Sequence, residues 1–269
     1  MFNNHYTPLN KIYLSKSNLL WNISRIKEIS KKHFYFPVLK SNAYGHDLKT
    51  IYSILKNENF PLVCVDSIYE AFQIYRINRN QQVLVMGYID PENLKIKKLP
   101  FQYVVWSLDQ INRISKHQPS AKFHLFIDTN MHREGIDIDE LKIICESMSN
   151  EMKSNIVGIM SHYSSSDEVG NSSNESQNVV FNEAIKIVVN SGINPKYIHI
   201  EASAGTLFKL SNVANSVRMG LDMYGISPVS DSDFNLKPVL SFITHIVQIK
   251  EIKLGGMVQW KFKKLICIL

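Results

Sequence analysis

The chain has 269 residues, of which 45% are hydrophobic and 20% charged, and its formal net charge is +6. This composition argues against a disordered protein and suits one barrel of about 250 residues or two smaller domains. The basic residues are scattered, in doublets such as Lys31-Lys32 and Lys97-Lys98. We therefore expect a solvated basic surface and no nucleic-acid partner.

Cysteine usage and the chain ends predict a cytoplasmic protein. Cys64, Cys145 and Cys267 are odd in number and far apart, which favours reduced thiols over a disulfide framework. Residues 1–10 are polar and lack the apolar core of a signal peptide, and no run is long enough to span a bilayer. The short tail from Lys261 is basic and apolar, but we expect no membrane anchor there.

Helical and strand signals alternate along the chain. Apolar residues recur at helical spacing after the capping candidates Ser17 and Asn18, and capping boxes are predicted at Ser67/Glu70 and Ser107/Gln110. A polar loop is predicted at residues 167–177. The predicted helices cover residues 19–29, 46–55, 67–77, 141–148 and 179–189, with further helix starts at 90–91 and 107. The predicted strands cover residues 34–39, 61–65, 83–86, 103–106, 123–127, 156–160, 197–200 and 217–219.

Eight buried apolar strands that alternate with helices indicate an α/β fold with a parallel sheet, and the number favours a (β/α)₈ barrel. The alternative is a doubly wound open sheet, but no G-x-G-x-x-G follows the first strand. After Pro228 the pattern changes, and residues 239–249 are rich in β-branched residues. They predict the first strand of a β-domain, so we divide the chain into domains at residues 1–230 and 231–269.

The first predicted strand runs into Val38-Leu39-Lys40-Ser41-Asn42-Ala43-Tyr44-Gly45-His46. Because barrel enzymes carry their chemistry at the C-terminal ends of strands, Lys40 is expected at the barrel mouth, where an amine can attack an aldehyde. A lysine that only extends its charged head to solvent satisfies the same pattern, so Lys40 alone does not decide between these interpretations.

The whole segment resembles the cofactor-lysine segment of the alanine racemase family, Val-Lys-Ala-Asn-Ala-Tyr-Gly-His, with Ser41 in place of an alanine. The resemblance implies a pyridoxal 5'-phosphate (PLP) cofactor that Lys40 holds as a Schiff base, with the hydroxyl of Tyr44 on its phosphate. It implies no metal. For His46 we expect a structural role as a cap of the following helix.

Two later strand ends also resemble this family. Residues 128–135 are similar to its Asp-Thr-Gly-Met-x-Arg-Leu-Gly segment, which implies that Arg133 contacts the cofactor's phenolic oxygen and the substrate carboxylate. A guanidinium suits this role because it stays charged and binds carboxylates as a fork. Residues 160–163 imply that His162 packs against the pyridine ring. Asn130 replaces a glycine, and asparagine tolerates a positive φ.

The last two segments imply a phosphate site. Residues 202–207 resemble the family's Asn-Ser-Ala-Ala-Thr-Leu, with Ala202 in place of the asparagine, and imply that Ser203 binds phosphate at the start of a short helix. The alternative role for Ser203 is a plain helix cap. Residues 217–225 imply that Arg218 faces the pyridine nitrogen. They also imply that the backbone of two residues completes the phosphate site, Gly220 and Leu221.

One departure concerns the partner of Arg133. Phe126 stands where the family often has a carbamylated lysine that orients the arginine. A phenyl ring cannot do this, so we expect Arg133 to pair with another group.

The resemblance implies interconversion of L-alanine and D-alanine, which supplies D-alanine for bacterial cell-wall synthesis, by a homodimer. Residues 1–230 would be the PLP-binding barrel, and residues 231–269 the truncated start of a C-terminal β-domain. In the family a tyrosine of that domain is the second catalytic base. No motif here replaces it, and the sequence around Trp260 does not follow the family pattern. We therefore expect partial or lost activity and a weakened dimer.

Two alternatives remain. One is a non-catalytic PLP-binding pseudoenzyme or PLP-homeostasis protein. The other is a degraded gene product in which residues 239–249 form an exposed, aggregation-prone edge strand.

Overall fold

The computed structural model describes residues 8–168, 170–228 and 234–251. Contacts within the chain define two compact units, one of residues 14–240 and one that joins residues 1–13 with 241–269. The expected domain boundary between residues 230 and 231 lies outside the described residues. Trp260 and Cys267 lie outside them as well.

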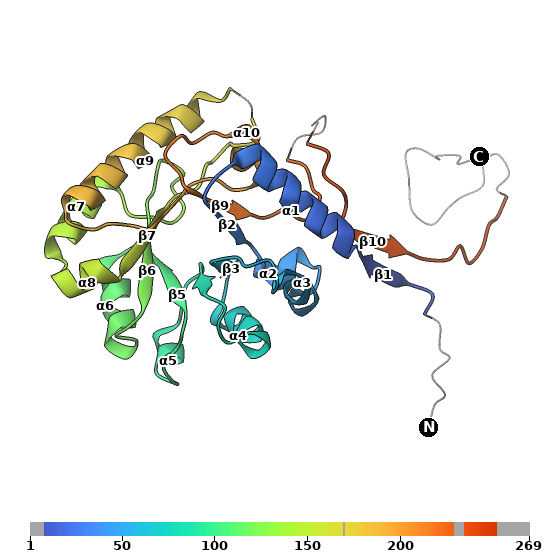
Figure 1. Ribbon diagram of the computed structural model, residues 1–269, viewed down its shortest axis with the longest axis horizontal. Coiled ribbons are helices and arrows are strands. Elements are labelled where there is room, and N and C mark those ends of the chain that lie inside the picture. Colours follow the sequence, from blue (N-terminus) through green and yellow to red (C-terminus); the bar gives the residue numbers. More distant parts are fainter. Residues whose placement is uncertain (1–7, 169, 229–233, 252–269) are drawn as a thin grey trace. The chain divides into compact units, whose positions relative to one another are not determined.

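The larger unit is built from parallel strands that alternate with helices (Figure 1). Within its described part, the strands of the barrel are β2 (Phe34–Pro37), β3 (Val63–Val65), β4 (Val83–Val85), β5 (Gln102–Val105), β6 (Lys122–Phe126), β7 (Ile156–Met160), β8 (Tyr197–His199) and β9 (Ser216–Met219). All eight predicted strands are therefore confirmed, with ends that differ by up to two residues.

Backbone hydrogen bonds close these strands into a ring. The strands β3 to β8 form a parallel sheet in sequence order, and β2 pairs in parallel with β9. A parallel bridge between Val38 and Cys64 joins the end of β2 to β3. On the other side, Arg218 N donates to Glu201 O over 3.1 Å, beside the end of β8. The predicted (β/α)₈ barrel is thus confirmed.

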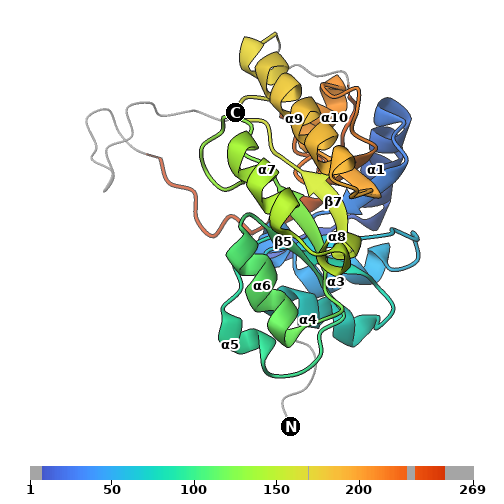
Figure 2. The same cartoon turned by 90° about the vertical axis from the view of Figure 1, so that its left-hand side faces the viewer.

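Helices surround the strands, and Figure 2 shows α4, α6, α7 and α9 on the outside. The helices are α1 (Lys16–Ser30), α2 (Lys40–Tyr44), α3 (Leu48–Leu55), α4 (Ile68–Ile77), α5 (Pro91–Leu94), α6 (Leu108–His117), α7 (Ile138–Ser147), α8 (Asn150–Asn155), α9 (Ser172–Asn190) and α10 (Ser203–Phe208). Their caps follow the sequence signals in part. The Ser67/Glu70 capping box is present. The predicted box at Ser107 is incomplete, because the Gln110 side chain accepts from Trp106 N and not from Ser107 N. The cap of α1 is Ser15, not Ser17 or Asn18.

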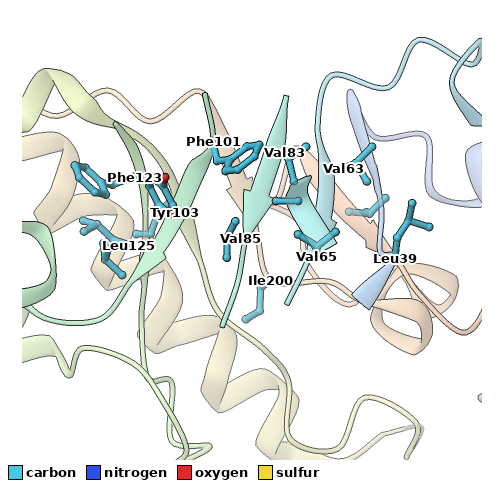
Figure 3. Close-up of a cluster of buried hydrophobic side chains, with 14 of the residues drawn as sticks. Leu39, Val63, Val65, Val83, Val85, Phe101, Tyr103, Phe123, Leu125 and Ile200 are labelled. Atoms are coloured by element: carbon cyan, nitrogen blue, oxygen red, sulfur yellow. The ribbon is translucent and has the colours of Figure 1, made fainter. Parts of the chain in front are cut away.

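Most residues of the barrel strands are buried on both faces of the sheet, which explains why their sequences are largely apolar. Side chains such as Val63, Val65, Val83 and Tyr103 pack toward the helices (Figure 3). Alternate residues fill the barrel interior, because successive side chains of a strand point to opposite faces. The interior cluster consists of Phe36, Val38, Leu62, Cys64, Leu84, Val104, Phe126, Met160 and Tyr197.

The prediction of a polar loop at residues 167–177 was wrong in its second half. The long helix α9 begins at Ser172, and Asn171 caps it through a hydrogen bond to Ser173 N. Its first turns are polar in sequence, and their buried residues are Asn174 and Gln177. Gln177 donates to Thr129 Oγ1 and to His162 O, each over 2.9 Å.

The described part of the smaller unit contains most of a two-stranded sheet of β1 (Lys11–Leu14) and β10 (Leu240–Ile243). The expected strand at residues 239–249 is therefore shorter than predicted. Thr244 Oγ1 donates to Asn10 Oδ1 over 2.6 Å next to this sheet. Among the described helices, none has the length and apolarity needed to cross a bilayer.

Candidate active site

A cavity of about 800 Å³ lies at the C-terminal ends of the barrel strands. It is lined by residues that follow β2, β6, β7, β8 and β9, together with apolar side chains such as Met86 and Trp106. All eight site residues predicted from the sequence are among its lining residues: Lys40, Tyr44, Arg133, His162, Ser203, Arg218, Gly220 and Leu221. The fold thus brings five separate segments to one place, while the roles of these residues stay predictions.

Lys40 begins an unusual left-handed turn. The next three residues, from Ser41 to Ala43, have φ angles of 54°, 54° and 56°, and Tyr44 follows with 53°. A left-handed backbone costs an L-amino acid about 1–2 kcal/mol per residue, so surrounding contacts have to hold this turn. Lys40 and Tyr44, at the two ends of this turn, both line the cavity.

Glu70 holds the lysine turn from α4. Its Oε1 accepts from Asn42 N over 3.0 Å, and its Oε2 accepts from Asp66 N over 2.9 Å. Glu70 is buried, and sequence analysis identified it only as part of a capping box. Asn42 Oδ1 in turn accepts from Leu48 N over 2.9 Å, which ties the turn to α3.

The sequence predicted that His46 caps the following helix, but it does not. Asp47 caps α3 by accepting from Thr50 N. The His46 ring instead bonds through Nδ1 to Ala43 O over 3.1 Å and stacks on Tyr224 at 4.5 Å. Its role is structural, as expected, but it supports the lysine turn.

The hydroxyl groups of two residues border the space at Gly220. A Cβ at position 220 would lie 3.3 Å from Tyr44 Oη and 3.4 Å from Ser203 Oγ. A hydrogen at Gly220 therefore leaves the space between the two hydroxyls open. We call Tyr44, Ser203, Gly220 and Leu221 the phosphate cup, because hydroxyl and backbone donors around an open space suit a phosphate group.

Ser203 is not a helix cap. The N-cap of α10 is Ala202, which makes no capping hydrogen bond. Ser203 Oγ instead donates to Asp222 Oδ1 over 3.0 Å. The hydroxyl is therefore oriented by a residue for which the sequence indicated no role.

Arg218 is buried at the floor of the cavity. Its Nη1 donates to His199 Nδ1 over 2.8 Å, and its Nη2 donates to Ser161 O over 2.8 Å and to His162 Nδ1 over 3.1 Å. Burial lowers the pKa of Arg218 to about 10, so the guanidinium stays charged near neutral pH. These contacts fix the plane of the guanidinium, which can only donate hydrogen bonds.

A chain of hydrogen bonds continues from Arg218 through the barrel interior. Because arginine only donates, His199 Nδ1 accepts, and its Nε2–H donates to His124 Nδ1 over 2.8 Å. His124 Nε2–H then donates to Gln102 Oε1 over 2.9 Å. Burial lowers the pKa of both histidines, of His124 to about 3, so both are neutral.

The sequence analysis did not identify this series of hydrogen bonds, although the sequence contains a sign of it. The polar residues occupy inward-facing positions of strands that are otherwise apolar, and strand prediction alone does not assign a partner to a buried histidine. Three of these residues lie on three different strands, Gln102 on β5, His124 on β6 and His199 on β8.

Desolvation, reinforced by the charge of Arg218, lowers the pKa of His162 to about 3. Its Nδ1 accepts from Arg218, so the ring is neutral and Nε2 carries the hydrogen. A neutral aromatic ring at the cavity wall can pack against a flat ligand without competing for its charge.

The Arg133 loop is folded by Asp128. Its Oδ1 accepts from Met131 N over 3.0 Å and from His132 N over 3.1 Å. Asn130 has a φ of 75°, which agrees with its expected tolerance of this conformation. The expected alternative partner of Arg133 is Glu134, which forms an ion pair with its Nε.

Phe126 lines the cavity near this loop and is 8% exposed. It belongs to the apolar cluster of the barrel interior. Arg133 and Glu134 also line the cavity, and 54% and 42% of their side chains are exposed to solvent. The guanidinium of Arg133 is therefore oriented by a solvent-exposed pair rather than from inside the barrel.

The residues present fit a phosphorylated aromatic cofactor such as PLP. The phosphate cup has an open space at Gly220 between two hydroxyls, and the cavity is wide enough for a small ligand. One amine, that of Lys40, reaches the same cavity. Among the described residues, no cluster of His, Cys, Asp or Glu side chains has the arrangement of a metal site.

Comparisons with known proteins agree with this geometry. Residues 14–228 match the family model "Alanine racemase, N-terminal domain". The alanine racemase of Fusobacterium nucleatum is 31% identical over 253 residues, which cover 93% of this chain and 70% of that protein. The alanine racemase of Borreliella burgdorferi is 30% identical over 271 residues, which cover 97% of this chain and 72% of that protein.

Solved structures support the same assignment. Alanine racemase from Bacillus anthracis with bound L-Ala-P is 27% identical, has a TM-score of 0.78, and covers 88% of this chain and 64% of its own. The fold is also similar to that of the Clostridium difficile alanine racemase in complex with cycloserine, with a TM-score of 0.80, 22% identity, and coverage of 91% and 70%. From the family match over most of its length, this chain belongs to the alanine racemase family, of which it contains the N-terminal domain.

Proposed function

We propose that this chain binds PLP in the cavity and moves the α-proton of alanine, as part of an interconversion of L-alanine and D-alanine. One observation carries the proposal. The five segments that resemble the family's motifs all contribute to one cavity, which contains an amine, two arginines and the phosphate cup. The relatives support the reaction class, since all those compared above are alanine racemases.

Each residue has a role that its chemistry allows. The guanidinium of Arg133 binds the carboxylate of alanine, for which its fork is suited. Lys40 Nζ moves the proton at Cα on one face of the substrate. PLP, when bound, supplies the electron sink that makes this proton acidic. Arg218, held by five hydrogen bonds, presents a donor and no acceptor to the ring nitrogen.

The next point is which face of the substrate Lys40 serves. Lys40 is the one lysine among the described residues that line the cavity. We propose that it serves the D-alanine face, so that this chain exchanges the α-proton of D-alanine with retention of configuration.

The experiment follows that proton. The purified chain is incubated with PLP and either D-alanine or L-alanine in heavy water, and the Cα proton and chirality are monitored by NMR and chiral chromatography. Lys40→Ala is the control for chemistry, and covalent attachment of PLP to Lys40 is read by mass after borohydride reduction. Exchange of D-alanine with retention, absent in Lys40→Ala, supports the proposal.

Two other results would change it. Inversion of either isomer would mean that a second base acts in this chain. Attachment of PLP to Lys40 without any exchange would favour a non-catalytic PLP-binding protein over a racemase.

A further inference from the structure

A carboxyl group without an expected role is hydrogen-bonded to the phosphate cup. Asp222 is fully buried, and its Oδ1 accepts from Ser203 Oγ over 3.0 Å and from Met223 N over 2.9 Å. The backbone N–H of Asp222 donates to Ser203 Oγ over 3.3 Å. Ser203 and Asp222 therefore form a closed pair in which the serine has one hydroxyl hydrogen to give.

An ionised carboxylate at this place is hydrogen-bonded but has no positive charge beside it among the described residues, because the Ser203 hydroxyl and the backbone of Gly220, Asp222 and Met223 only partly offset its burial. Oδ2 of Asp222 has no hydrogen-bond partner in the described part of the chain. The titratable groups that interact with it are the phenols of Tyr44 and Tyr224, which carry no positive charge. None of the ion pairs formed by the described residues includes Asp222. Burial raises the pKa of Asp222 to about 6.

We propose that the phosphate cup binds an organic phosphate together with one proton, which is held on Asp222. The proposal rests on the proposed function, since Ser203 has to face the phosphate. In the ionised state the hydroxyl hydrogen of Ser203 points to Asp222 Oδ1 and is unavailable to an anion.

Protonation reverses the direction of this hydrogen bond. A proton from solvent binds to Oδ1, and the resulting carboxyl group donates to Ser203 Oγ. The hydroxyl hydrogen of Ser203 then turns to the phosphate oxygen. When the phosphate leaves, the proton returns to solvent. Protonation also removes the negative charge of Asp222 from beside the phosphate. Two anions at this place would repel each other, because the dielectric constant is low in the protein interior.

A measurable linkage follows. Above the pKa of Asp222, each unit of pH lowers the affinity for an organic phosphate by up to about tenfold, because the free site has to take up a proton. Below that pKa, Asp222 is already neutral and this dependence disappears. A site of arginine, hydroxyl and backbone donors without a buried acid would show no such fall above pH 7, because these donors do not titrate there and the phosphate is already mostly a dianion.

The test uses pyridoxine 5'-phosphate, which carries the phosphate but has no aldehyde to react with Lys40. Its affinity for the wild-type chain and for Asp222→Asn is measured by calorimetry between pH 7 and 9. Buffers of different ionisation enthalpy report the protons taken up. We expect the wild type to take up about one proton more than Asp222→Asn. We also expect the variant to bind at least tenfold more tightly at pH 8 and to lose the steep pH dependence.

Controls separate the two proposals. Pyridoxine without phosphate should show no difference in proton uptake between the two chains, and Ser203→Ala should lose the linkage in an otherwise wild-type site. Equal proton uptake by the wild type and Asp222→Asn would overturn the role of Asp222 while the proposed function stands. If pyridoxine 5'-phosphate binds neither chain at any pH, the phosphate cup itself is wrong, and the proposed function fails with it.

Discussion

Gly158 on β7 provides the space in which the imidazole of His124 lies. The two residues are partners in the register of β6 and β7, and a Cβ at position 158 would be 2.1 Å from His124 Nδ1. That nitrogen accepts the hydrogen bond from His199, which in turn holds Arg218. The absence of one side chain thus permits the hydrogen-bond chain below the cavity.

The first prediction concerns this contact. Gly158→Ala should lower the free energy of unfolding by at least about 2 kcal/mol, because the new methyl group displaces a buried ring. Urea unfolding of the wild type, of Gly158→Ala, of His124→Ala and of the double variant gives a double-mutant cycle. The cost of the alanine at 158 should be much smaller when His124 is absent. An equal cost in both backgrounds would contradict the steric explanation.

The second prediction concerns acid stability. His124 and His162 have pKa values of about 3 in the folded chain, well below the ordinary value of 6.5. Between these values the unfolded state binds more protons, so stability falls as the pH falls, by up to about 1.4 kcal/mol per pH unit for each histidine. His124→Gln stays neutral and should flatten the dependence by one such contribution. Superimposable stability curves from pH 6.5 to 4 would refute this.

The third prediction has the opposite sign. Burial raises the pKa of Asp222 from 3.8 to about 6, so the stability that its neutral form contributes is present below pH 3.8 and is lost as the pH rises through 6. The difference corresponds to about 3 kcal/mol. Asp222→Asn should therefore be more stable than the wild type at pH 8, by up to that amount, and the gain should be lost at pH 3.5. Denaturant unfolding at both pH values measures it, and an equal gain at both would point to packing instead of charge.

The fourth prediction tests the left-handed turn. Glu70→Ala removes the acceptor of Asn42 N and of Asp66 N, two part-buried hydrogen bonds that are each worth about 0.5–1.5 kcal/mol. Lys40 should then be less well placed, and the rate of PLP attachment to it should fall at least tenfold. Glu92→Ala is the matched control, since Glu92 is a surface glutamate paired with Lys95. Attachment at the wild-type rate in Glu70→Ala would show that the turn holds itself.

The sequence by itself determined the architecture and the membership of the site. Eight apolar runs separated by helical patterns predict a parallel barrel, and in such a barrel every strand ends on the same rim. The order of segments along the chain was therefore enough to bring Lys40, Arg133, His162 and Ser203 to one cavity. Departures from the family pattern, such as Phe126, were also evident from the sequence, because they concern only which side chain is present.

Tertiary structure alone decided how those side chains are held. The left-handed turn after Lys40 depends on Glu70, which lies 28 residues from Asn42 in the sequence. The buried position of Gln177 in the first turns of α9 depends on the bonds that it makes to residues after β6 and β7, where local polarity predicts a loop. The pairing of Ser203 with Asp222 joins two strand ends. Local propensity contains no information on such contacts, since their energy arises only when distant segments exclude water together.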